Sequence, residues 1–123
     1  MQKTEKKLEE LECGDIIKLN FSPTKGDEQD GYRPAVILTN PKKQNKLLNG
    51  MVSVAPITNT KKGFPLHVNL DSRIKTKGVI LMDHHRMVDL QGREFQYVEK
   101  LSLEQIQKCK EIYEALYEEL LTK

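Results

Sequence analysis

Residues 14–38 read GDIIKLNFSPTKGDEQDGYRPAVIL and carry more information about the fold than any other segment of this 123-residue chain. In the first part, Ile17, Leu19 and Phe21 alternate with polar residues, which is the period-2 pattern of a half-buried β-strand. Pro34 lacks an amide hydrogen, so we predict that a second strand starts there and continues through the apolar run that follows. About a dozen residues join the two strands, a length typical of functional loops.

Further short strands are predicted, because brief apolar runs alternate with Gly, Pro and polar turns along the chain. The predicted strands are residues 16–21, 35–39, 52–55, 67–70, 79–82, 86–88 and 97–100. Short strands of this kind favour a small barrel or sandwich. A chain of 123 residues is expected to form one domain with a modest core, without a second catalytic domain.

A helix is predicted near the C-terminal end. Ser102 is a suitable N-cap with Gln105 three residues later, and Leu101 can pack onto Ile106 as a hydrophobic staple. Apolar residues then recur on one helical face, namely Ile106, Cys109, Ile112, Tyr113, Leu116, Tyr117 and Leu120. We expect this stripe to be core or interface.

The remaining segments suggest a cytoplasmic protein without a cofactor. Residues 2–12 are predicted to add a short N-terminal helix. No apolar run is long enough to span a bilayer, and the charged N-terminus lacks the apolar region of a signal peptide. Cys13 and Cys109 have no Cys-x-x-Cys or His spacing around them, so we expect two reduced structural thiols rather than a zinc site or a disulfide framework.

Charge is unevenly distributed along the chain. The formal charge of +2 is the sum of −1 in residues 1–12, −2 in residues 102–123 and +5 between them. The basic residues of the middle region crowd three predicted loops, with Lys42, Lys43 and Lys46 in the first, Lys61 and Lys62 in the second, and Arg73, Lys75 and Lys77 in the third. Solubility explains any single Lys, whereas such clusters attract a polyanion.

Residues 14–38 resemble the N-terminal signature of the MazF/PemK toxins. In that family a strand headed by Gly-Asp leads through a Pro-Thr-Lys-Gly loop and Glu-Gln to a second strand that opens with Arg-Pro. The matching residues here are Gly14, Asp15, Pro23, Thr24, Lys25, Gly26, Glu28, Gln29, Arg33 and Pro34. Residues 55–65, APITNTKKGFP, resemble the next block of the family, and residues 83–95, DHHRMVDLQGREF, show a looser similarity.

This resemblance implies a fold and an activity. The fold would be mostly β with α, a small SH3-like barrel of the CcdB/MazF/PemK type with a long C-terminal helix. Residues 13–123 would form this single toxin domain, after an N-terminal extension at residues 1–12. The activity would be that of an mRNA interferase, a sequence-specific, ribosome-independent endoribonuclease. Its partners would be single-stranded RNA, an acidic MazE/PemI-like antitoxin and a second copy of the chain, with no membrane.

The resemblance also implies catalytic residues. Arg33 matches the catalytic Arg of the family, and Thr58 matches the catalytic Thr that follows a Pro by two residues, here Pro56. Metal-independent cleavage uses the ribose 2′-hydroxyl as nucleophile, and the planar guanidinium of Arg33 is suited to stabilise the negatively charged phosphorane. Glu28 is the carboxylate placed by the motif, and it is expected to act either as general base or as a reader of a base edge.

RNA-binding residues are expected around these positions. They are Thr24, Lys25, Gln29, Lys61, Lys62, Asp83, His84 and Arg86. The family usually has an acidic residue followed by Gln where this chain has Asp83 and His84, a departure that bears on base preference because Gln and His offer different donors and acceptors. His84 and His85 would point to opposite faces of a strand, so they are not expected to flank one phosphate. His67 is expected to be a strand residue without a chemical role.

Two other functions are consistent with the same residues. One is a non-enzymatic barrel that poisons a protein target, as the similarly folded CcdB toxins do with DNA gyrase. The other is a binding module without nuclease activity. The presence of both Arg33 and Thr58 in one chain favours the enzyme.

Overall fold

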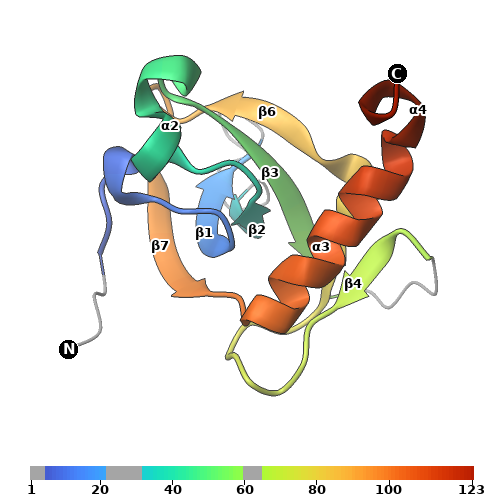
Figure 1. The fold of residues 1–123 in the computed structure, drawn as a ribbon. Helices are drawn as coiled ribbons and strands as arrows, with labels where there is room; N and C mark the ends of the chain where they lie inside the picture. The colour runs from blue at the N-terminus through green and yellow to red at the C-terminus, as the bar shows by residue number, and fades with distance from the viewer. Residues whose placement is uncertain (1–4, 22–31, 60–64) are drawn as a thin grey trace.

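The computed structural model describes residues 5–21, 32–59 and 65–123. Its elements, in chain order, are η1 (Leu8–Glu10), β1 (Asp15–Asn20), β2 (Tyr32–Ile37), α2 (Pro41–Leu48), β3 (Met51–Thr58), β4 (His67–Asn69), β5 (Val79–Leu81), η2 (Met82–His84), β6 (Arg86–Asp89), β7 (Phe95–Lys100), α3 (Leu103–Leu116) and α4 (Glu118–Leu121), where η marks a 3₁₀ turn. Figure 1 shows a strongly curved sheet with α3 lying across one side of it.

The seven strands pair antiparallel in the order β4–β5–β3–β2–β1–β7, and β6 pairs with the first half of β3. One edge of β3 therefore faces β2, and its other edge faces β6 at residues 51–54 and β5 at residues 57–58. The turn η2 links β5 to β6 beside Ala55 and Pro56. The predicted mostly β architecture with a C-terminal helix is confirmed. Within the described residues β6 and β7 are not paired with each other, so backbone hydrogen bonds do not close the sheet into a barrel there.

All seven predicted strands are present, with shifts at their ends. The prediction that the second strand starts at Pro34 is wrong by two residues, because β2 already pairs with β1 at Tyr32, opposite Asn20. Pairing of β2 with β3 starts only at Ala35. Pro34 thus lies in a part of β2 that has one partner strand, where a missing amide hydrogen is tolerated.

Residues 41–48, predicted as a basic loop, form helix α2 instead. The side chain of Asn40 accepts a hydrogen bond from the amide of Lys43 at 3.2 Å. Pro41 occupies the first helical position, where a missing amide hydrogen does no harm. Asn49 ends the helix in the left-handed conformation, with φ of 50°. The basic residues of this segment therefore lie on a capped helix.

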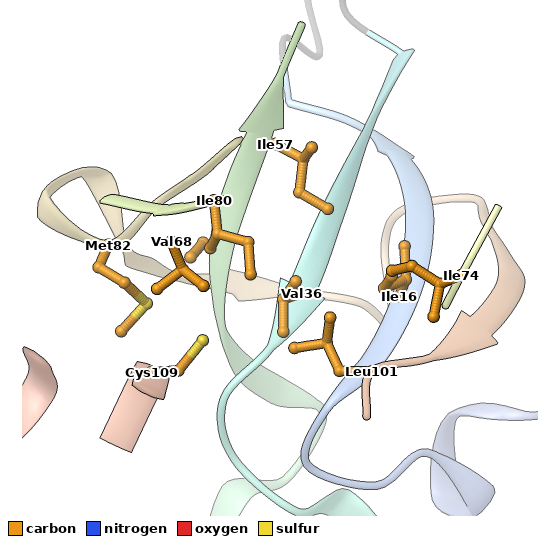
Figure 2. Close-up of a cluster of buried hydrophobic side chains, with 10 residues drawn as sticks. Ile16, Val36, Ile57, Val68, Ile74, Ile80, Met82, Leu101 and Cys109 are labelled. Atoms are coloured by element: carbon orange, nitrogen blue, oxygen red, sulfur yellow. The ribbon is translucent and has the colours of Figure 1, made fainter. Parts of the chain in front are cut away.

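The sheet carries a buried cluster on each face. The first cluster lies beneath α3 (Figure 2) and consists of Ile16, Val36, Ala55, Ile57, Val68, Ile74, Ile80, Met82, Leu101 and Cys109. The second cluster consists of Leu11, Ile17, Leu19, Ala35, Ile37, Val52, Val54, Val88 and Leu90. Successive strand residues point to opposite faces, so Val36 belongs to the first cluster while Ala35 and Ile37 belong to the second.

Helix α3 begins as its cap predicts. Ser102 Oγ accepts a hydrogen bond from the amide of Gln105 at 3.3 Å, and Leu101 and Ile106 both pack in the first cluster. The side chain of Gln105 does not return to the cap. It is buried and donates from Nε2 to the carbonyl oxygen of Asn69 at 2.8 Å, which ties the helix to the end of β4.

The predicted apolar stripe of this helix divides into two halves. Cys109 is buried and Ile112 packs against the first cluster, whereas Tyr113, Leu116 and Leu120 are exposed. Tyr117, with φ of −113° and ψ of 24°, separates α3 from α4. The first half of the stripe is therefore core, and the second half lies open. No helix in the described parts of the chain is both long and apolar enough to cross a membrane.

The N-terminal segment is fastened to the sheet through Asp15. Lys6 Nζ donates to Asp15 Oδ2 at 2.9 Å and lies 4.8 Å from the centroid of the Tyr97 ring. The fully buried Asp15 side chain also accepts from the amide of Glu12 at 2.8 Å. Of the helix predicted over residues 2–12, the described residues 5–12 contain only the 3₁₀ turn η1, and residues 2–4 lie outside the described residues. Leu11, after the turn, is buried in the second cluster.

Candidate functional site

Arg33 and Thr58 lie on neighbouring strands at the same end of the sheet. Ala35 stands opposite Pro56 in the pairing of β2 with β3, and continuing that register by two residues places Arg33 opposite Thr58. Opposite residues of an antiparallel pair carry their side chains on one face. The register with β1 and β5 extends this line, named here the Arg33 row, which consists of Leu19, Arg33, Thr58 and Val79.

The Arg33 row lies on the face of the sheet opposite to α3, because Leu19 belongs to the second cluster. Arg33 is exposed and Thr58 is half-buried, so the row lies at the solvent-exposed end of this face. Thr58 lies three residues beyond the strand predicted at residues 52–55, because the observed strand is longer. It is the last residue of β3, and pairing with Val79 holds its backbone.

Gly78 brings β5 close to Thr58, a contribution that sequence reasoning missed. Its φ of 124° is a conformation that other residues rarely adopt, and a Cβ at this position would collide with the carbonyl oxygen of Thr58. The glycine therefore permits a close approach of the two backbones at the candidate site. A Gly directly before a predicted strand is the signal that identifies such a position.

Asp83, His84 and His67 form a polar cluster near the Arg33 row. His67 Nε2 lies 3.0 Å from Asp83 Oδ1, and His84 Nε2 lies 3.8 Å from Asp83 Oδ2. His67 is a strand residue as predicted, in β4, and its side chain is 4% exposed against 61% for His84. Sequence reasoning missed its contact with Asp83 because residues 67 and 83 become neighbours only through the pairing of β4 with β5.

His84 and His85 are not in a strand, so the premise used to separate them is wrong. His84 ends the turn η2 and His85 caps it. His85 Nδ1 lies 2.7 Å from the carbonyl oxygen of Met82, and its Nε2 lies 2.8 Å from the hydroxyl oxygen of Tyr117. A carbonyl only accepts, so Nδ1 carries the hydrogen, and Nε2 pairs with the Tyr117 hydroxyl. His85 thus links η2 to the end of α3.

Two arginines hold the end of β1. Arg86 Nη2 donates to the carbonyl oxygen of Phe21 at 3.2 Å, and its guanidinium lies 4.7 Å from the Phe21 ring centroid. Arg93 Nη1 donates to the carbonyl oxygen of Asn20 at 2.8 Å. Arg86, predicted to bind RNA, therefore also has a structural contact, and Arg93 is an anchor that the sequence did not single out.

A groove of about 950 Å³ lies between α3 and the sheet. Its floor is apolar, and the exposed half of the helical stripe forms one wall through Tyr113, Tyr117 and Leu120. The lining contains Lys43, Arg86 and Lys110 but no carboxylate among the described residues. The groove is therefore apolar with a basic rim.

Both cysteines also line this groove. Burial raises the pKa of the Cys109 thiol to about 12, and burial likewise raises the pKa of Cys13. Both thiols are therefore protonated and weakly nucleophilic near neutral pH.

Six of the predicted site residues lie outside the described residues. They are Thr24, Lys25, Glu28, Gln29, Lys61 and Lys62. Of the five that are described, the strand register places Arg33 and Thr58 in one row. Asp83 and His84 stand in the cluster beside η2, and Arg86 lies against the end of β1. Within the described ranges, no group of three or more His, Cys, Asp or Glu could hold a metal ion.

Residues 12–116 match the family described as the PemK-like, MazF-like toxins of type II toxin–antitoxin systems. The chain belongs to this family of toxins, which confirms the resemblance drawn from its sequence.

Individual relatives agree with that assignment. The chain is 39% identical over 82 residues to the endoribonuclease toxin MazF of Escherichia coli strain K12, an alignment that covers 67% of this chain and 71% of that protein. It is 40% identical over 95 residues to the endoribonuclease toxin ChpB of the same organism, with coverage of 71% and 77%. The crystal structure of MazF (Form-I) from Deinococcus radiodurans superposes with a TM-score of 0.73 at 28% identity, over 85% of this chain and 94% of that chain.

Proposed function

We propose that this chain is a sequence-specific, ribosome-independent endoribonuclease, an mRNA interferase that acts as the toxin of a type II toxin–antitoxin system in the cytoplasm. The observation that carries the proposal is the β2–β3 register: its last pair is Ala35 with Pro56, and Arg33 and Thr58 each follow two residues further toward the exposed end of the sheet. Further support comes from relatives that are named endoribonuclease toxins.

In the proposed reaction the ribose 2′-oxygen forms a bond to the adjacent phosphorus while the bond from phosphorus to the 5′-oxygen breaks. A base takes the proton of the 2′-hydroxyl, and the leaving 5′-oxygen gains a proton. The products are a 2′,3′-cyclic phosphate and a 5′-hydroxyl. The Arg33 guanidinium stabilises the phosphorane with two N–H donors, and the Thr58 hydroxyl donates to a phosphate oxygen. Glu28 is proposed as the general base or as a reader of a base edge.

The substrate is proposed to bind as a single strand, because splayed bases expose their edges to side chains. The proposed RNA-binding residues are Thr24, Lys25, Gln29, Lys61, Lys62, Asp83, His84 and Arg86. Two of the described members, Asp83 and His84, lie beside the half of β3 that ends in Thr58.

A homodimer and an antitoxin complex are also proposed. The exposed large apolar residues that lie along the groove or at the helix end beside it are Met87, Tyr113, Leu116, Leu120 and Leu121. An apolar surface of this kind, in a small domain, is typical of a protein interface. The proposed antitoxin is acidic, and its disordered tail would fold into a basic groove shared by the two protomers and exclude RNA from it. One neighbouring structure, at 26% identity and a TM-score of 0.75, is a MazE–MazF complex from Deinococcus radiodurans that covers 87% of this chain and 95% of that chain.

We further propose that residues 13–123 form one toxin domain whose sheet closes as an SH3-like barrel. Support comes from Arg86 in β6, which reaches the carbonyl oxygen of Phe21 just after β1. In the pairing order, β6 and β1 are separated by β3 and β2. The contact therefore joins two parts of the sheet that are not neighbours in the pairing order.

The activity is tested by incubating purified full-length protein with a panel of short RNAs in EDTA and by identifying the product ends by mass spectrometry. We expect cleavage with 2′,3′-cyclic phosphate and 5′-hydroxyl ends. A 5′-phosphate, or activity that is lost with chelator and restored by magnesium, would contradict the mechanism. Inhibition of DNA gyrase without any RNA cleavage would support the non-enzymatic alternative, and RNA binding without cleavage would support a binding module.

The dimer is tested by sedimentation at micromolar concentration. We expect Leu120→Asp to shift the protein toward monomer, because Leu120 is 75% exposed and lines the groove. Leu103→Asp is the matched control, since Leu103 is 81% exposed at the other end of α3 and is not a groove residue. A wild-type monomer, or equal effects of both changes, would count against this interface.

A further inference from the structure

His67 holds the Asp83 carboxylate in place. The imidazole is 96% removed from solvent, and its Nε2 lies 3.0 Å from Asp83 Oδ1. Because a carboxylate only accepts hydrogen bonds, Nε2 must carry the hydrogen. A buried N–H is costly to leave without an acceptor, so this contact restrains the orientation of Asp83. The pairing of His67 with Leu81 sets the backbone of β4 against the chain that leads into Asp83.

The other side of Asp83 remains accessible. The Asp83 side chain is 25% exposed, and its Oδ2 lies 3.8 Å from Nε2 of His84, whose side chain is 61% exposed. Oδ1 is engaged by His67, which leaves Oδ2, next to the His84 ring, as the oxygen available to a ligand. The three residues therefore offer a fixed acceptor beside an adjustable imidazole at the surface.

This cluster stands on the same face of the sheet as the Arg33 row. His67 is opposite Leu81, and the register of β5 with β3 extends this line to Pro56, two residues before Thr58. Strands lie about 4.8 Å apart and alternate residues are separated by about 6.8 Å, so the Cα atoms of His67 and Thr58 are roughly 12 Å apart. Neighbouring nucleotides of a strand whose phosphate is held at Arg33 can span that separation.

A carboxylate at this position is suited to bind a base and not a phosphate, because a carboxylate and a phosphate are both negatively charged and repel each other. Adenine and cytosine each place an amino N–H donor beside a ring-nitrogen acceptor. Such an edge matches Oδ2 of Asp83 together with an N–H of His84. Uracil instead flanks its one N–H with two carbonyl oxygens, which would face the carboxylate. The cluster therefore discriminates against uracil.

We propose that Asp83 and His84 read one base next to the scissile phosphate, with preference for adenine or cytosine over uracil, and that His67 is the positioning residue of this reader. The proposal rests on the ribonuclease function proposed above. In this proposal His67 acts through Asp83 and does not itself contact RNA.

The test uses single-turnover cleavage by the full-length chain. RNAs that carry each of the four bases at every position around the mapped wild-type cut site are compared. The ratio of rates between bases is the readout, because loss of folded protein lowers all rates equally. We expect Asp83→Asn to reduce discrimination against uracil at one position by roughly tenfold, the scale of one good base contact. His67→Leu should reduce it in the same direction at the same position.

The conservative variant His67→Gln retains an N–H donor near the place of Nε2 and is expected to restore the wild-type ratios. Glu114→Gln, an exposed change of the same kind on α3, is the control and should leave the ratios unaltered. If Asp83→Asn and His67→Leu slow cleavage of all RNAs in proportion, the role of the pair is structural and the inference is wrong. A wild-type protein that cuts no RNA would overturn this inference together with the proposed function.

Discussion

The two faces of the sheet differ in what covers them. On one face, α3 closes the first cluster, and the fit is tight enough that a Cβ at Gly14 would collide with Ile106. On the other face the second cluster is open at one end, where Arg33 is exposed and Thr58 is half-buried. This difference indicates that the covered face stabilises the fold, whereas residues at the open end are available for catalysis. Substitutions on the two faces should therefore have separable effects.

The largest effect is expected at the open end. Arg33→Ala should lower the single-turnover cleavage rate by roughly two to three orders of magnitude, the scale for removal of one preorganised transition-state donor. RNA affinity should fall much less, because many basic residues share the phosphate contacts. Stability should change by under about 1 kcal/mol, since Arg33 is exposed.

Arg33→Lys sharpens this test, because it keeps the charge but loses the two-pronged donor geometry. Little activity should return. Cleavage kinetics, an equilibrium binding assay on the same RNA and thermal unfolding decide the outcome. Near wild-type cleavage by Arg33→Ala would show that the catalytic assignment is wrong.

The covered face should respond in the opposite way. Ile16 is fully buried in the first cluster, so Ile16→Ala should lower the free energy of unfolding by about 2–5 kcal/mol. The cleavage rate per folded molecule should stay near that of wild type. Denaturant unfolding and active-site-normalised kinetics measure the two quantities. A large loss of rate in fully folded protein would break the separation of the two faces.

A smaller effect is expected at Thr58. Thr58→Ala should slow cleavage by roughly tenfold, less than Arg33→Ala, because one neutral hydroxyl donor is lost. Thr58→Ser keeps the hydroxyl and should retain most of the activity. Single-turnover rates of the two variants are compared on one RNA. If the serine variant is as slow as the alanine variant, the hydroxyl is not the group that matters.

The smallest effect concerns Glu99 at the end of β7. Burial disfavours its charged form, but hydrogen bonds from the Thr76 hydroxyl and from the amides of Lys75 and Thr76 outweigh burial and lower the pKa of Glu99. A carboxyl group with a lowered folded-state pKa contributes stability above its unfolded pKa of about 4.3, and that stability is lost as the pH falls through the folded-state value.

Glu99→Gln should therefore lower the free energy of unfolding by about 1 kcal/mol at pH 7, and the difference from wild type should shrink below about pH 4. Urea unfolding at several pH values is the measurement, with Glu94→Gln as the exposed control. A difference that grows toward acid would contradict the sign of the pKa shift. Neither variant should alter base preference, because Glu99 lies on β7, at the end of the strand order opposite to β4 and His67.

Local patterns predicted much of the fold. The alternation of Ile17 and Leu19 predicted β1, and the Ser102 cap predicted the start of α3, because each depends on residues close in sequence. Helix α2 was missed although Asn40 and Pro41 form a good helix start, since the segment has little apolar periodicity and was interpreted from its charge. The start of β2 was predicted two residues too late, because pairing with β1 extends the strand to Tyr32, beyond the first-residue position that Pro34 favours.

The sequence by itself determined the seven strands and the capped start of α3, and through its resemblance to the family it indicated Arg33 and Thr58 as candidate site residues. Only the tertiary structure decided that these two residues stand in one row and that His67 meets Asp83 across β4 and β5. The physical reason is the range of the forces involved. Caps and periodicity act over a few residues, whereas strand register is selected by the burial of whole faces, so residues far apart in sequence become neighbours only when the sheet assembles.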